Sequence, residues 1–293
     1  MLYRRQKLLL SLLKILGGEA KSTDFQKLLF LYTKEYEEEP SYEFIPYKYG
    51  CFSFTSYADK RKLIERGYLE DSENWKIKNA GPEPGIEQRQ SLFLLNKKYG
   101  MKRGADLINE VYSRYPETAW RSEIVDTVVK DSDIKRRIKR AKPARKGPGL
   151  VTIGYEGKTL ERYLNILLED GVTVLCDVRR NPLSRKYGFS KGTLSSSCVS
   201  VGIQYKHLPE LGIASEQRRE LKTQQDYDML FTFYERNSLP KQGEALKRIA
   251  SWVDGGERVA LTCYEHEPQQ CHRHCVAEAV EQQIEGILDL CHL

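Results

Sequence analysis

The sequence predicts an α/β chain in which a Rossmann-like, three-layer domain with a parallel sheet follows a mainly helical, winged-helix-like domain. In the second half, short apolar runs alternate with segments of helical spacing, as expected for a parallel sheet covered by helices. In the first half, helical stripes lead into a hairpin instead. A chain of 293 residues is long enough for two domains. The predicted division is 1–80 for the winged-helix-like domain, 81–148 for a helical linker with a basic arm, and 149–293 for the Rossmann-like domain.

The first half has the element order of a winged helix. Apolar side chains with helical spacing predict the helices, and a polar turn between two short apolar runs predicts the hairpin. The predicted elements are helices over 5–16, 23–32 and 56–66, a looped or extended stretch over 42–55, a hairpin over 68–77, and further helices over 91–99, 104–115 and 118–129. The third helix carries Lys60, Arg61, Lys62 and Arg66, which would meet nucleic acid phosphates or bases. The alternative is a protein-interaction or dimerisation surface with a solvated basic face.

Positive charge is concentrated in the first half. Residues 1–150 hold 30 Lys and Arg against 21 Asp and Glu, whereas residues 151–293 hold 17 against 20. The segment 134–146 alone contains eight Lys and Arg and no acid, and from it we take Arg136, Arg137, Lys139 and Arg140 as candidate nucleic-acid contacts. Such a stretch is either an exposed linker or an arm that binds phosphates with salt-sensitive affinity.

Polar side chains follow each predicted strand of the second half. The strands are 150–154, 172–176, 203–207 and 259–263, and the helices between and after them are 160–168, 191–201, a helical excursion over 215–251, and 271–287. Since the carboxyl ends of parallel strands lie along one edge, these side chains should share a cleft. They are Tyr155 and Glu156 after the first strand, Asp177, Arg179, Arg180 and Arg185 after the second, Tyr205 and His207 in the third, and Cys263 and Glu265 at the fourth.

Four segments carry a family resemblance. TIGYEG at 152–157, DVRRNPLSR at 177–185, YKHLPELG at 205–212 and LTCYEHEPQQCHR at 261–273 resemble the motifs of the Domain of Unknown Function 488 family. The resemblance implies the α/β fold and its cleft, but little chemistry. The first loop departs from the family, whose members usually have a His-Ser or similar pair where this chain has Tyr155 and Glu156. In the first half, the segment from Phe25 to Leu69 resembles the SocA-like antitoxin (Panacea) domains.

Several chemistries fit the predicted cleft. Arg179, Arg180, Arg185 and Arg273 suit a phosphate-bearing substrate, as do Cys271 and His272 at a helix N-terminus. The alternative is a structural ion network of these arginines with Asp177, Glu156 and Glu265. For glycosidic hydrolysis, Asp177, Glu265 or Glu156 would act as acid or base, with Arg179 and Arg273 as clamps and Tyr155, Tyr205 and His207 holding the base.

Two other chemistries compete with glycosidic hydrolysis. Cys271 could be a nucleophile activated by the helix end and Arg273, although no phosphate-cradling glycine loop precedes it. Cys263, Cys271, His272, His274 and Cys275 are the right ligand types for zinc. Their spacing argues against it, because residues 271, 272 and 274 of one helix point in divergent directions. We therefore predict no metal and no cofactor.

The function that the sequence predicts is that of a nucleic-acid-binding enzyme acting on a nucleotide or DNA base, with glycosidic hydrolysis in DNA repair or phage defence as the reaction. The alternatives are a nucleotide-sensing, DNA-binding regulator and Cys-dependent phosphate or thiol chemistry. No apolar run approaches a membrane span, and seven scattered cysteines predict reduced thiols in a cytoplasmic protein. The choice between DNA and RNA and the oligomeric state are open.

Overall fold

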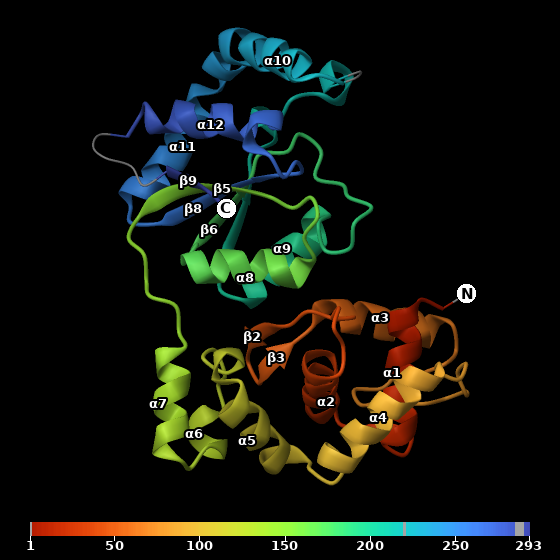
Figure 1. Ribbon diagram of the computed structural model, residues 1–293. Helices are drawn as coiled ribbons and strands as arrows, with labels where there is room; N and C mark the ends of the chain where they lie inside the picture. The colour runs from red at the N-terminus through yellow and green to blue at the C-terminus, as the bar shows by residue number, and fades with distance from the viewer. Residues whose placement is uncertain (1, 219–220, 285–289) are drawn as a thin grey trace. The chain divides into compact units, whose positions relative to one another are not determined.

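The computed structural model describes residues 2–218, 221–284 and 290–293, and it divides into two compact units, Met1–Lys142 and Pro143–Leu293 (Figure 1). Parts of two predicted helical segments, at 219–220 and 285–287, lie outside the described residues. None of the helices within the described residues is long and apolar enough to cross a membrane.

The first unit is mainly helical and contains the predicted series of three helices and a hairpin. Its elements are α1 (Arg4–Ile15), β1 (Glu19–Ala20), α2 (Ser22–Glu35), β2 (Ile45–Tyr47), β3 (Gly50–Phe52), α3 (Phe54–Glu65), β4 (Trp75–Lys76), α4 (Ile86–Tyr99), α5 (Gly104–Arg114), η1 (Pro116–Thr118), α6 (Val125–Val128) and α7 (Ser132–Arg140). The predicted helix over 118–129 is reduced to the short α6, and the basic segment begins as α7. The hairpin pairs back onto β1 through β4. Gly50 has the positive φ, 86°, that the tight turn from β2 to β3 requires.

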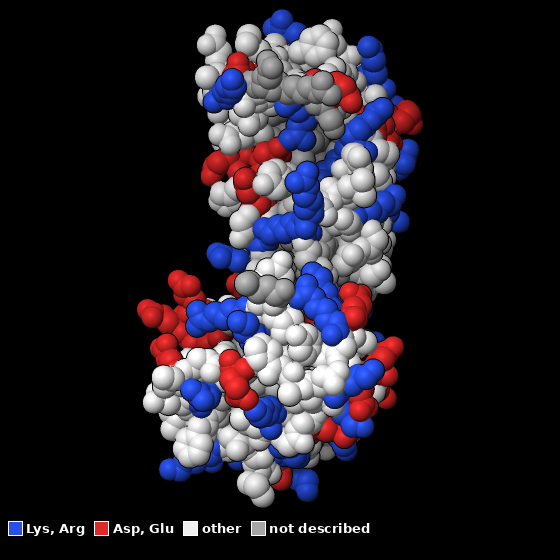
Figure 2. All heavy atoms as spheres, turned by 90° about the vertical axis from the view of Figure 1, so that its right-hand side faces the viewer, with Lys and Arg blue, Asp and Glu red and all other residues white. Residues whose placement is uncertain are grey.

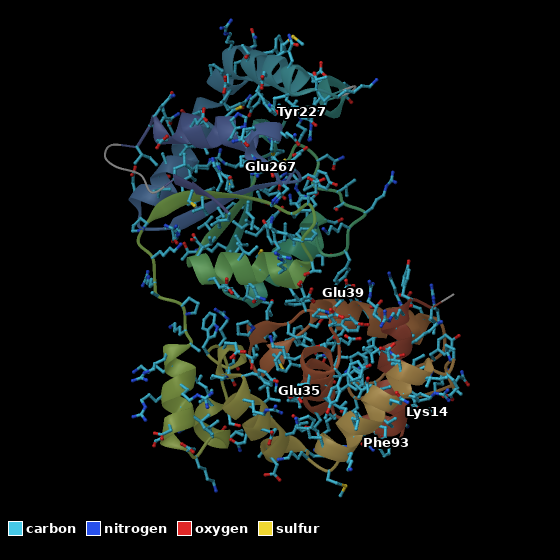
Figure 3. The ribbon with its side chains drawn as sticks, viewed as in Figure 1. Lys14, Glu35, Glu39, Phe93, Tyr227 and Glu267 are labelled. Atoms are coloured by element: carbon cyan, nitrogen blue, oxygen red, sulfur yellow. The ribbon has the colours of Figure 1, made fainter. Side chains whose placement is uncertain are left out.

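One hydrophobic core runs through the first unit. Trp75 is fully buried and stacks on Phe25 of α2 at a centroid distance of 4.0 Å. Leu95 of α4 and Val111 of α5 belong to the same cluster, so the helices after residue 85 pack with the earlier ones. Glu35, the last residue of α2, is labelled in Figure 3. It accepts hydrogen bonds from the hydroxyls of Tyr99, at the end of α4, and Tyr115, just after α5.

The second unit is the predicted parallel α/β domain. Its strands are β5 (Gly149–Gly154), β6 (Val174–Asp177), β7 (Gln204–His207), β8 (Arg258–Cys263) and β9 (Leu290–His292), all parallel, in the order β7-β6-β8-β5-β9. β5, β6 and β8 are buried along their whole length, as their apolar runs predict. β9 was not predicted, because Leu-Cys-His is too short and too polar to stand out in the sequence.

Helices cover both faces of this sheet. Figure 1 shows α8 (Leu160–Asp170) and α9 (Lys191–Ser200) on one face and α11 (Gly243–Asp254) and α12 (Arg273–Glu281) on the other. The remaining long helix, α10 (Gln224–Asn237), precedes α11. After β5 the chain passes through α8 toward β6, and after β8 it passes through α12 toward β9 on the opposite side. The adjacent strands β5 and β8 thus form the topological switch point, where open parallel sheets bind their ligands.

Candidate functional site

The strand register brings the predicted site residues to one edge of the sheet. Gly154 lies beside Cys263, so Tyr155 and Tyr264 are the first residues beyond β5 and β8. Asp177 lies between Thr262 of β8 and His207 of β7. The register thus places Tyr155, Asp177, His207 and Cys263 along the carboxyl edge of the sheet.

Asp177 and Arg179 form a buried ion pair at this edge. The two side chains are 0% and 5% exposed. Oδ1 of Asp177 accepts hydrogen bonds from Nε of Arg179 at 2.8 Å and from its backbone N–H, and Nη2 lies 2.5 Å from Oδ2. Burial lowers the pKa of Arg179, but the bonds and charge of Asp177 outweigh it and hold that pKa above its ordinary value. Arg179 is therefore fixed in place and permanently charged.

Neighbouring aromatic and histidine side chains complete the support of this pair. The Tyr205 hydroxyl donates to Oδ2 of Asp177 at 2.6 Å, and the Tyr155 hydroxyl accepts from Nη1 of Arg179 at 3.0 Å. His207 donates from Nε2 to the Arg179 carbonyl at 2.9 Å, while Lys191 donates to its Nδ1. These three predicted site residues thus orient Arg179, and Asp177 itself has no exposed surface from which to reach a substrate.

A cavity of about 310 Å³ opens beside Arg179. Its lining comprises Tyr155, Arg179, Arg180, Asn181, Leu183, Ser184, Arg185, Ile213, Arg218, Cys263 and Tyr264. The lining therefore contains four arginines and, among the described residues, no carboxylate. Arg180 and Arg185 are exposed, and neither has a side-chain hydrogen bond or ion pair with a described residue. Figure 2 shows Lys and Arg gathered over the second unit on the face turned toward the viewer.

Arg218 was missed by the sequence reasoning and is the fourth arginine of the cavity. It lies in the short helix η3 (Ser215–Arg218), between β7 and α10. Its guanidinium is paired with Oε1 of Glu265. Burial raises the pKa of Glu265, but the positive charge of Arg218 outweighs it, so that pKa lies below its ordinary value. Nothing in the pattern around residue 218 marks it, because this segment lies far from any strand end in the sequence.

The loop from β8 to α12 is held tightly against β5. A methyl group added to Gly154 would lie 1.8 Å from the Glu265 carbonyl oxygen, so only glycine fits there. Arg273 is 1% exposed and donates to the carbonyls of Glu265 and His266 at 2.6 and 2.8 Å. This arginine, predicted as a phosphate clamp, therefore clamps the loop. Glu156 is exposed, accepts from the His266 backbone N–H at 2.9 Å and does not line the cavity.

Two cysteines and a histidine lie buried behind the cavity. Cys263, Cys271 and His272 offer two sulfurs and a ring nitrogen, which all lie within 4.8 Å of one another. The Cys271 thiol is 1% exposed, and burial first, then the neighbouring Cys263, raises its pKa well above the ordinary value. That environment is the opposite of what activates a nucleophilic cysteine.

The basic residues predicted to contact nucleic acid occupy different environments in the first unit. Lys60 is buried and donates to the three backbone carbonyls of residues 72–74 at 2.9, 3.0 and 2.9 Å, so it holds the hairpin turn. Arg61 and Lys62 are exposed on α3, and Arg66 is exposed just after it. On α7, Arg136 pairs with Asp133 at 2.6 Å, whereas Arg137, Lys139 and Arg140 are exposed. The first unit also has a cavity of about 490 Å³, which Arg61 lines together with Tyr47, Tyr49 and Tyr57.

Comparison with known proteins gives one family. No curated protein and no solved structure matches the chain. These comparisons do not show the SocA-like resemblance of the first half. The match found covers β6, β7 and β8 and the loops that carry the arginines and the cysteine–histidine cluster, and it begins after the Tyr155 loop. The family model that matches residues 159–280 of this chain is that of DUF488, a domain of unknown function.

Proposed function

We propose that the second unit recognises a phosphate-bearing ligand of the nucleotide class, either free or within a nucleic acid strand, in the cavity at the switch point. The observation that carries the proposal is the lining of that cavity, with four arginines and no carboxylate among its described residues. The fixed fork of N–H donors on arginine matches phosphate oxygens better than other side chains do.

The four arginines contribute in different ways. Arg179 is pre-oriented by Asp177, so little conformational entropy is lost when its remaining N–H group meets an anion. Arg180 and Arg185 are exposed and supply charge that no described carboxylate neutralises. The charge of Arg218 is balanced by Glu265. The cavity thus offers two uncompensated positive charges, on Arg180 and Arg185, and a spare N–H donor on Arg179, which together suit a phosphate group.

Aromatic side chains favour a nucleotide over inorganic phosphate. Tyr264 lines the cavity, is 44% exposed and packs edge-to-face against Tyr155 at a centroid distance of 5.3 Å. Stacking of a base on an exposed aromatic ring contributes about 1–3 kcal/mol. The phosphate and the base of one ligand could therefore be recognised together within this cavity.

The proposal extends to processing of the bound nucleotide or base, with glycosidic hydrolysis as the predicted reaction. Such hydrolysis uses two carboxyl groups that flank the bond. Of the three predicted carboxylates, Asp177 is inaccessible, Glu156 is not part of the cavity lining, and Glu265 adjoins it through Arg218. Phosphate recognition is therefore better supported than any one reaction, and the nucleotide-sensing regulator stands as the alternative.

Exposed cations of the first unit support a nucleic acid as the carrier of the phosphate. The outer face of α7 presents Arg137, Lys139 and Arg140, and α3 presents Arg61 and Lys62. We propose that these side chains contact backbone phosphates. Such contacts release counterions, so the affinity should fall steeply as salt concentration rises.

The test is binding of fluorescent single-stranded and duplex DNA and RNA, and of a fluorescent nucleoside monophosphate, to the full chain across a salt series. The double variant Arg180→Ala/Arg185→Ala should bind every probe that the unchanged chain binds at least about tenfold more weakly. This corresponds to a loss of at least about 1.4 kcal/mol in binding free energy. The matched control is Arg162→Ala/Arg236→Ala, which removes two exposed arginines of the same unit outside the cavity. Equal binding by the two double variants would refute the proposal.

The same mixtures separate an enzyme from a sensor. Free base, nucleoside or abasic strand in the reaction, measured by chromatography, would indicate turnover. A sensor would bind the probe with the same loss in the cavity variant and would give no product at any time point.

A further inference from the structure

The buried cysteine–histidine cluster has the donor atoms of a metal site. Cys263 ends β8, Glu265 follows two residues later, and Cys271 and His272 immediately precede α12. The three side chains of Cys263, Cys271 and His272 are 0, 1 and 2% exposed. Glu265 contacts the same group, because its Oε2 lies 3.5 Å from the Cys263 sulfur. Figure 3 labels Glu267, on the loop that joins these residues.

The hydrogen bonds fix His272 in the tautomer that a metal ligand needs. Its Nε2 lies 3.1 Å from the Val178 carbonyl oxygen, which can only accept, so Nε2 carries the proton. The unprotonated Nδ1 then faces the Cys263 sulfur at 3.8 Å. Metal-binding histidines typically donate their second N–H to a backbone carbonyl or carboxylate in this way.

Two donor–donor distances, both measured from the Cys263 sulfur, match the edges of a tetrahedral site. With metal–sulfur bonds of about 2.3 Å and metal–nitrogen or metal–oxygen bonds of about 2.1 Å, the sulfur-to-nitrogen or sulfur-to-oxygen edge of a tetrahedron is about 3.6 Å. The edges from the Cys263 sulfur measure 3.8 Å to His272 and 3.5 Å to Glu265. Along these two edges the donor atoms already have the spacing that a tetrahedral ion requires.

The sequence argument against zinc depended on the predicted last helix, which was taken to begin at residue 271. It placed residues 271, 272 and 274 on one helix, pointing in divergent directions. In the structure α12 begins at Arg273, and Cys271 has the extended backbone angles φ −142° and ψ 127°. The extended residue turns the Cys271 side chain back toward Cys263, so the two sulfurs and the imidazole converge.

We propose that Cys263, Cys271, His272 and Glu265 bind one divalent transition-metal ion of the zinc class. Binding would convert two thiols to metal-bound thiolates and release their two protons to water, with no change of oxidation state. Two thiolates and one carboxylate together with the ion carry a net charge of −1, which the guanidinium of Arg218 on the other oxygen of Glu265 neutralises. A buried neutral cluster avoids the cost of an uncompensated charge. The site goes beyond the proposed function and does not depend on it.

The ion would fasten the end of β8 to the start of α12. Cys263 also lines the arginine cavity, so the ion would set the position of one wall of that cavity. With four protein ligands the site is closed, as in structural zinc sites, and no coordination position remains for water.

The experiment is metal analysis of the full chain, followed by titration of the metal-free, reduced protein with Co²⁺ and then with Zn²⁺. We expect about one metal ion per chain after purification without chelator, and a thiolate-to-Co²⁺ charge-transfer absorption that Zn²⁺ abolishes. Cys263→Ser and Cys271→Ser should each lose the absorption and at least tenfold in Zn²⁺ affinity. Cys291→Ser is the matched control, since Cys291 is an exposed cysteine outside the cluster.

Two results would overturn the assignment. If the folded wild-type chain shows no charge-transfer absorption and binds no Zn²⁺, the site does not exist, whatever the variants do. If Cys275→Ser abolishes metal binding and Cys271→Ser does not, the ion belongs to the neighbouring group of Glu235, His274 and Cys275. Both results are readable without any ligand in the arginine cavity, so they leave the proposed function untouched.

Discussion

Replacing Asp177 by Asn should destabilise the second unit strongly, because it leaves the buried positive charge of Arg179 without a counter-ion. Asn has nearly the same shape as Asp, but it carries no charge and has one acceptor oxygen in place of two. Arg179 is 5% exposed and has its ion pair with Asp177 alone among the described residues. Removing one partner of a buried ion pair typically costs about 3–5 kcal/mol, and we expect a loss near the lower of these values, about 3 kcal/mol.

Hydrogen exchange with peptide resolution is the suitable assay, because a chain of two units need not unfold in a single transition. Amides of β6 and β7 are protected by the sheet that Asp177 joins. If they exchange through global opening of the second unit, a loss of about 3 kcal/mol speeds their exchange by roughly 150-fold. Amides in the core of the first unit should be unchanged and serve as the internal control.

A second variant separates charge from packing. Arg179→Met also breaks the pair, but the double variant Asp177→Asn/Arg179→Met removes both charges and should be less destabilised than the sum of the single variants. If Asp177→Asn changes exchange in β6 and β7 by less than about fivefold, or if the two effects simply add, Asp177 does not act as the counter-ion of Arg179.

Three further predictions concern other parts of the chain. Nε of Arg258 lies 2.5 Å from a carboxylate oxygen of Asp170. Burial raises the pKa of Asp170, but the hydrogen bonds and charges of Arg258 and Lys146 outweigh it and lower that pKa. Its stabilisation is therefore present above the ordinary pKa of 3.8 and lost as pH falls below it, and Asp170→Asn should flatten the acid limb of a stability-against-pH curve. Gly154→Ala should cost about 1–3 kcal/mol in thermal or denaturant unfolding, because the added methyl group displaces the Glu265 backbone; unchanged stability would contradict that close approach. Removing the three exposed cations of α7 should reduce the salt slope of nucleic acid binding by about one for each phosphate that these side chains bind, and an unchanged slope would place the phosphate-binding surface elsewhere; the variant is Arg137→Ala/Lys139→Ala/Arg140→Ala.

The buried parallel strands could be read from the sequence because their environment is uniform. β5, β6 and β8 have apolar neighbours on both faces, and this produces continuous apolar runs that few other structures share. β9 lies at the sheet edge with exposed residues, so its pairing with β5 leaves no pattern. The convergence of polar residues at the carboxyl edge followed from topology alone, without knowledge of any side-chain contact.

Side-chain roles were harder to predict than positions. Lys60 and Arg273 were taken as phosphate contacts because they are cations in plausible places, yet their charges are directed at backbone carbonyls. Arg218 was missed because only the tertiary fold brings it from the segment before α10 to the cavity. The convergence of Cys263, Cys271 and His272 did not follow from the sequence, because whether Cys271 is extended or helical decides where its sulfur points.

Arg218 connects the two proposed sites and allows their coupling to be tested. Its guanidinium lines the anion cavity and at the same time balances the charge of Glu265 beside the two cysteines. Arg218→Ala should therefore weaken binding of the fluorescent nucleotide and also lower Zn²⁺ affinity about 10- to 100-fold, the usual effect of losing a residue that supports a metal ligand. Arg180→Ala, which removes a cavity arginine with no ion pair to Glu265, should weaken nucleotide binding and leave Zn²⁺ affinity unchanged. Competition with a chelator measures the second quantity directly. If Arg218→Ala leaves Zn²⁺ affinity unchanged in a chain that binds the ion, Arg218 does not hold Glu265 as a ligand. The proposed site of four ligands would then be reduced to a site of three ligands, Cys263, Cys271 and His272.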